Sequence, residues 1–162
     1  MAPPSAISHV LELCLYVKDI HASNKFYTEI MGLTAEELQP AILKERMSVF
    51  PMGNTTLLLF ALGQTDEDVR PIPSQPDICI PKHGPEAKTM AALMEGGEKL
   101  RQHYCLAVET KHQAIAWERY LKEKGVECNG RMEWPRGGYS VYFLDPDGHV
   151  GEVASRGIWA HY

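Results

Sequence analysis

The chain has 162 residues, 44% of them hydrophobic and 23% charged, and a formal net charge of −5 at pH 7. These values are typical of a globular protein, and the length predicts one domain over residues 1–162. No run of Lys and Arg is present, which argues against a nucleic-acid partner and against an anionic membrane surface. The first ten residues lack the basic and apolar segments of a secretory signal, and the apolar stretch 57–62 is too short to span a membrane.

The four cysteines are spread along the chain and form no CxxC pair. They are Cys14, Cys79, Cys105 and Cys128. This spacing favours free thiols over disulfides, and therefore predicts a protein of the reducing cytoplasm.

The first half of the chain is predicted to form a strand, a helix and three more strands. Over residues 10–17, apolar side chains alternate with polar or small ones, which is typical of a strand buried on one face. Asp19 follows as the predicted N-cap of a helix that ends at Gly32. The later strands are expected over residues 33–38, 46–51 and 55–62, with a tight turn at Gly53-Asn54.

The second half shows the same order of elements. A strand is predicted over residues 103–108, and Thr110 with Gln113 forms a candidate capping box for a helix that ends near Gly125. The remaining strands are expected over residues 126–130, 139–144 and 149–154, with a loop at 131–138.

A shift of 91 positions superposes the two halves. The segment ELCLYV, which begins at Glu12, falls on HYCLAV, which begins at His103, with three identities in six positions. Residue 58 stands four positions after Asn54 in one turn, and residue 152 stands four after Gly148 in the other. A duplicated unit of one helix and four strands explains these coincidences.

The segment between the halves differs in composition, because residues 63–100 contain five prolines and an acidic cluster. It is predicted to be a linker that closes over a pocket, with a short helix at 87–95. The fold class is therefore expected to be α+β, with tandem βαβββ modules over about 9–62 and 101–156. Each half-sheet is too small to be stable alone, so we expect both to form one half-open curved sheet or barrel around a cavity.

The duplication makes four positions equivalent in pairs. They hold Glu12 and His103 in the first strands, and Leu58 and Glu152 in the last strands. Taken singly, each polar member reads as a surface residue or as a structural histidine. Taken together, two carboxylates and one imidazole in apolar strands favour a metal site, because a buried carboxylate must be paired, protonated or bound to a metal.

Three segments resemble the glyoxalase / bleomycin-resistance / extradiol-dioxygenase superfamily, whose fold is called the vicinal oxygen chelate fold. They are ELCLYVKDIHASNKFYTEIMGL, HYCLAVETKHQAIAWERYLKEKGV and YFLDPDGHVGEVA. The resemblance implies a divalent metal (Mn, Fe, Zn, Ni or Mg) on Glu12, His103 and Glu152, with Leu58 in the fourth ligand position. It also implies a homodimer, and a catalytic role for Glu152 as a proton acceptor.

The closing hairpin is similar to that of fosfomycin-resistance transferases, which implies that Ser140 and Tyr142 line a substrate pocket. Leu58 is expected to face the same cavity as the three ligands and to shape the pocket. In the loop before the hairpin, Trp134 and Arg136 are candidates for the pocket rim, where a guanidinium binds an anionic substrate group. The other histidines fall at ends, turns and helix starts and are expected at the surface. They are His9, His21, His83, His112, His149 and His161.

These features predict a metal-dependent enzyme whose small, oxygen-rich substrate chelates the metal through two adjacent oxygens. The reaction stays open between a lyase or isomerase like lactoylglutathione lyase, a ring-cleaving dioxygenase and a thiol transferase. The alternative from another class is a metal-free binding protein similar to bleomycin-resistance proteins. Those proteins lack the ligand residues, three of which this chain retains.

Overall fold

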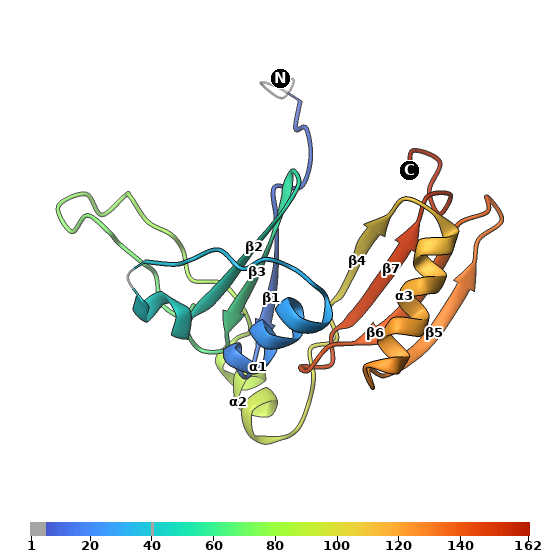
Figure 1. Cartoon of the computed structure of the whole chain (residues 1–162). Helices are drawn as coiled ribbons and strands as arrows, with labels where there is room; N and C mark the ends of the chain where they lie inside the picture. The colour runs from blue at the N-terminus through green and yellow to red at the C-terminus, as the bar shows by residue number, and fades with distance from the viewer. Residues whose placement is uncertain (1–5, 40) are drawn as a thin grey trace.

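The computed structural model describes residues 6–39 and 41–162. The first five of the ten residues that were predicted to contain no secretory signal lie outside the described residues. Figure 1 shows two separate sheets, one from each half of the chain. The first sheet has the order β1-β3-β2, from β1 (Glu12–Val17), β3 (Thr55–Ala61) and β2 (Met47–Met52). The second has the order β4-β7-β6-β5, from β4 (His103–Val108), β7 (Val150–Ser155), β6 (Tyr139–Leu144) and β5 (Cys128–Glu133).

Each half of the chain contains one main helical segment, and the linker contains a third. The helical segments are α1 (Ile20–Lys25), which continues as the π-helical turn η1 (Phe26–Ile30), the 3₁₀ segment η2 (Ala41–Glu45), α2 (Ala87–Glu95) and α3 (Lys111–Glu123). The capping predictions are confirmed. Asp19 accepts hydrogen bonds from the backbone N–H groups of His21 and Ala22, and Thr110 forms a capping box with Gln113.

The register of the strands confirms the internal repeat. The first and last strands of each half are parallel neighbours, β1 with β3 and β4 with β7. Cys14 pairs with Leu58, and Cys105 pairs with Glu152, so the two candidate last-strand positions occupy equivalent places. The predicted α+β fold of two modules is therefore confirmed, as an open arrangement of two sheets and not a closed barrel.

Two predicted segments differ in the structure. Residues 33–38 form no strand, because they run beside β2 with a single backbone hydrogen bond, from Glu36 N–H to the Val49 carbonyl. The first sheet consequently has three strands instead of four. In the second module, residues 131–133 belong to β5 instead of a loop, and the chain reverses in a tight turn in which Trp134 N–H bonds the Gly138 carbonyl.

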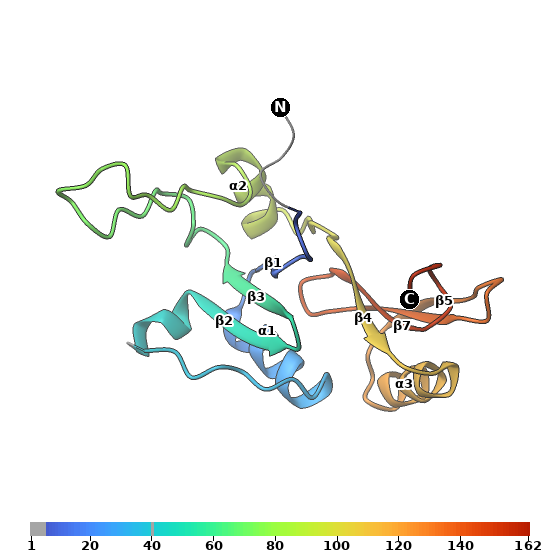
Figure 2. The same cartoon turned by 90° about the horizontal axis from the view of Figure 1, so that it is seen from above.

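One hydrophobic core joins the two modules. Figure 2 shows α1 and α3 on the same side of the two sheets. The buried apolar side chains of both sheets gather on this helix side, among them Leu15, Leu57, Tyr104, Val141 and Val153. Alternate residues of the same strands project to the opposite side, which we call the open face.

The modules also meet through hydrogen bonds at the end of β1. The Gln102 side chain accepts from Tyr16 N–H at 3.4 Å and donates to the Cys14 carbonyl at 3.4 Å. His149 Nε2 lies 2.9 Å from the Tyr16 carbonyl oxygen. His149 Nδ1 accepts a hydrogen bond from Gln102 N–H at 3.2 Å. His149 is only 1% exposed, so its predicted surface position is wrong. The turn before β7 directs the ring inward against β1, a contact between residues too distant in sequence for local patterns to reveal.

The helix predicted in the linker is confirmed as α2. The linker lies against the open face of the first module. Thr65, Val69, Ile80 and His83 line one cavity together with side chains of β1 and β3. Among the residues that the structure describes, no helix is long and apolar enough to cross a membrane.

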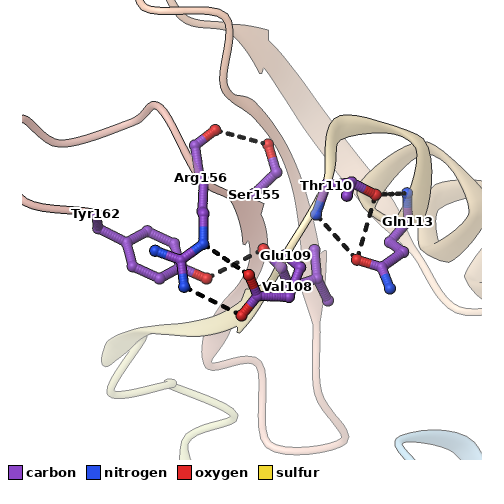
Figure 3. A network of polar contacts seen from close by, with 7 residues as sticks. All are labelled: Val108, Glu109, Thr110, Gln113, Ser155, Arg156 and Tyr162. Atoms are coloured by element: carbon purple, nitrogen blue, oxygen red, sulfur yellow. Dashed lines mark hydrogen bonds and ion pairs between the residues drawn. The ribbon is translucent and has the colours of Figure 1, made fainter.

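The segment after β7 is fastened across the ends of β4 and β7 (Figure 3). Arg156 binds both carboxylate oxygens of Glu109, at 2.6 and 3.2 Å, and its guanidinium lies 4.9 Å from the centre of the Tyr162 ring. The Tyr162 hydroxyl donates to the Val108 carbonyl at 3.0 Å. These contacts hold together the last residues of β4 and β7. His103 and Glu152 lie near the first residues of the same two strands.

Candidate functional site

His103 and Glu152 lie side by side on the open face of the second sheet. His103 Nε2 is 3.3 Å from Glu152 Oε2, and His103 Nδ1 is 3.0 Å from the Val150 carbonyl oxygen. A carbonyl oxygen only accepts hydrogen bonds, so this contact places the ring proton on Nδ1. Nε2 then carries a lone pair toward the carboxylate, and a proton or a cation between the two atoms would satisfy both.

Glu152 is buried in a way that suits a cation. Its side chain is 7% exposed, and its Oε2 faces His103 Nε2 at 3.3 Å. The second carboxylate oxygen, Oε1, is buried without a hydrogen-bond partner among the described residues. Leaving a buried carboxylate oxygen unpaired is costly, whereas a metal ion that binds carboxylate oxygen and imidazole nitrogen removes the cost. The pair therefore fits part of a divalent-metal site.

The neighbours of Glu152 are weak acids that stay protonated. Burial raises the pKa of the Cys105 thiol to about 12, and the Glu152 carboxylate adds to the rise. Burial also raises the pKa of Tyr142, and Glu152 raises it further. Both side chains therefore add no further negative charge beside the carboxylate at neutral pH.

Glu12 does not join this pair within one chain. Across residues 6–39 and 41–162, no group of three or more His, Cys, Asp or Glu side chains is placed to hold a metal ion. Glu12 instead lines the cavity of the first module with Leu58, which is 8% exposed. The four predicted site residues therefore form two separate groups in one chain. His103 lies with Glu152 in the second module, and Glu12 lies with Leu58 in the first.

The direction of the strands explains the separation. The hydrogen bonds of Gln102 fix the start of β4 beside Tyr16, near the end of β1. Glu12 stands four residues earlier, about 13 Å back along the strand at a rise of about 3.3 Å per residue. Figure 1 shows β1 running toward the junction of the modules and β4 running away from it. Glu12 and His103 therefore lie a strand length apart.

The predicted substrate residues occupy different surroundings. Ser140 and Tyr142 alternate on β6, and Tyr142 is paired with Glu152, so both share its face. The Trp134 indole N–H donates to Ser140 Oγ at 2.8 Å, which places this ring beside the same strand. Arg136 is exposed in the hairpin turn and does not line the cavity of the first module. Its role as an anion clamp stays a prediction.

The sequence did not single out the residues that shape the first-module cavity. Tyr16, Phe60 and Arg46 line it together with His83 of the linker. Tyr16 had a signal, since it alternates with the buried row of its strand as Glu12 does. His83 had none, because its position depends on how the linker folds back against the sheet.

Comparisons with known proteins place this fold in a family. A model of the Glyoxalase/Bleomycin resistance protein/Dioxygenase superfamily matches residues 6–153. A search of curated proteins gave no match. Among solved structures, a lactoylglutathione lyase from Agrobacterium tumefaciens is 27% identical with a TM-score of 0.72, covering 98% of this chain and 99% of that one.

Two further structures resemble the chain in fold. A glyoxalase/dioxygenase from Nostoc punctiforme is 24% identical with a TM-score of 0.59, over 96% of this chain and 95% of that one. A glyoxalase-related enzyme from Fulvimarina pelagi is 18% identical with a TM-score of 0.62, over 94% and 91%. With the family model covering most of the sequence and the duplicated modules in the expected register, the chain belongs to the Glyoxalase/Bleomycin resistance protein/Dioxygenase superfamily.

Proposed function

We propose that the protein is a metal-dependent enzyme acting on a small, oxygen-rich substrate. His103 and Glu152 hold a divalent cation, and Glu12 of a second copy of the chain completes the ligand set. The observation that carries this proposal is the state of the Glu152 carboxylate: Oε2 lies 3.3 Å from His103 Nε2, and Oε1 is buried with no hydrogen-bond partner among the described residues.

The second copy is supported by the geometry of one chain. Glu12 and the His103–Glu152 pair both project from the open face, but a strand length separates them. A homodimer that places the first module of one copy against the second module of the other would bring Glu12 to the pair. It would also cover His103, whose side chain is 54% exposed in the single chain.

The residues around the pair suggest how the site works. The bound cation supplies Lewis acidity to two adjacent substrate oxygens. Glu152 is the proposed catalytic residue, because the carboxylate can take up a substrate proton. Tyr142, which stays protonated, donates a hydrogen bond at the same face, and Ser140 with Trp134 borders the substrate. Leu58 keeps one side of the site apolar and adds no ligand.

Two other functions remain as competitors. The similarity to a lactoylglutathione lyase favours a lyase or isomerase reaction, although Leu58 in the fourth ligand position offers no metal ligand. A metal-free binding protein is favoured by the contact between His103 and Glu152, which would be a simple ion pair if the imidazole carried a proton.

The four free cysteines support a reducing compartment such as the cytoplasm.

Titration with Mn²⁺ at several pH values tests the metal site directly. The histidine ligand must be neutral and the carboxylates ionised, so protons compete with the metal. We therefore expect tight binding at pH 7.5, and an affinity that falls steadily as the pH is lowered to 5.5. Calorimetry on chelator-treated protein measures both. Weak, pH-independent binding would leave the metal-free binding protein as the better account.

A further inference from the structure

A cavity of about 570 Å³ lies between the open face of the first module and the linker. We call it the module-one cavity. Leu58, Phe60 and Tyr16 line it from β1 and β3, and His83 from the linker. Its volume is in the range of pockets that bind small molecules, and its mostly apolar walls suit an organic body more than a free ion.

Three rings form one wall of the module-one cavity. Phe60 lies 6.2 Å from Tyr16 and 5.0 Å from His83, measured between ring centres. The Tyr16 hydroxyl hydrogen-bonds His83 Nδ1 at 2.6 Å. Thr65 fixes His83 through two further bonds, at 2.6 and 2.9 Å. The wall is therefore held in place before a ligand arrives, and it offers ring faces and edges to a flat molecule.

Arg46 brings a positive charge to the same cavity. One of its terminal nitrogens donates to the Gln64 carbonyl at 2.7 Å. In the part of the chain that the structure describes, Arg46 makes no ion pair with a carboxylate, although Glu67 also lines the cavity. Its remaining N–H groups are available to bind an anion in a fork geometry.

Glu12 and Arg46 lie at opposite ends of the cavity. Glu12 pairs with Thr56 at the start of β1, whereas Met47, the neighbour of Arg46, pairs with Phe60 near the end of β3. The two rows are four residues apart, or about 13 Å along the strands. A ligand therefore meets a carboxylate at one end, apolar and aromatic side chains in the middle, and a guanidinium at the other.

We infer that the module-one cavity binds a small amphipathic anion, with its aromatic body on the ring wall and its carboxylate or phosphate group on Arg46. The opposite end of the same molecule would reach the metal beside Glu12, and in this one respect the binding mode rests on the proposed function. The substrate class is then an aromatic or conjugated acid that carries oxygens at the end remote from its acid group.

Binding of 4-phenylbutanoate to chelator-treated protein tests the inference without the metal. We expect saturable binding by calorimetry, and at least about tenfold weaker binding of 4-phenylbutanamide and of butanoate, which lack the charge and the ring respectively. Arg46→Gln should lower the affinity for 4-phenylbutanoate about tenfold or more, and Arg46→Lys should restore part of it. Arg119→Gln, which removes an exposed arginine of α3, is the matched control and should have no effect.

Equal binding to wild type and Arg46→Gln, or a loss caused by Arg136→Gln instead, would overturn the inference. Mn²⁺ affinity measured on the same samples separates it from the proposed function. Arg46-dependent binding of 4-phenylbutanoate by a protein that binds no metal would contradict only the proposed function. Normal metal binding without Arg46-dependent anion binding would contradict only the inference.

Discussion

Replacement of Glu152 by glutamine is expected to lower the affinity for Mn²⁺ by more than about hundredfold, since changes to groups that merely support a ligand already cost about 10–100-fold. The amide keeps the shape of the side chain but loses the negative charge that a hard cation requires. The fold should survive, because the change removes a buried charge whose Oε1 has no hydrogen-bond partner among the described residues. Calorimetry measures the affinity, and circular dichroism checks the fold.

The matched control is Glu133→Gln on the edge strand β5, whose carboxylate is exposed and paired with Lys111. It removes the same charge from the same sheet and should leave the Mn²⁺ affinity unchanged. His103→Ala should match the loss seen for Glu152→Gln. Unchanged affinity in both site variants would place any metal elsewhere in the protein.

Gly151→Ala is expected to destabilise the fold by about 2–3 kcal/mol, and to lower the Tm by roughly 5–10 °C, because it overpacks the core. A Cβ atom at this position would lie 2.6 and 2.7 Å from two ring atoms of Phe143. That ring is fully buried and packs edge-on against Tyr104, so it has little room to move. Thermal and urea unfolding measure the effect.

Gly130→Ala is the control for this substitution. Gly130 lies on β5, and its added Cβ would meet Tyr142 at 3.6 Å, an ordinary contact distance. The stability should change by no more than about 0.5 kcal/mol, as for most surface positions. Similar losses for the two alanine variants would mean that the contact with Phe143 is not the cause of the destabilisation.

The fold was predictable because its signals are local and occur twice. Alternation in the strands, the caps at Asp19 and Thr110, and the repeat over the two halves all depend on near neighbours in sequence. The repeat also placed Leu58 and Glu152 in equivalent positions, which the pairing with Cys14 and Cys105 confirms. The family resemblance followed from the same segments.

The remaining features depend on contacts between distant residues. Residues 33–38 have a strand-like pattern, yet only one hydrogen bond joins them to β2. His149 follows a turn and looks exposed in the sequence, but the junction of the modules encloses it. The repeat relates Glu12 to His103 by symmetry of the modules, which says nothing of the distance between them in one chain. His83 lines the cavity with Arg46 only because the linker folds back.

A mixed dimer of Glu12→Gln and His103→Ala chains tests most directly whether two copies share the metal site. Each variant alone should lose tight Mn²⁺ binding. In the mixed dimer, intact Glu12 of one chain meets intact His103 and Glu152 of the other, so one tight site per dimer should return. Isolation through two different affinity tags and titration with Mn²⁺ gives the stoichiometry. No recovery in the mixed dimer, or tight binding by a monomeric wild-type chain, would contradict a site built from two copies.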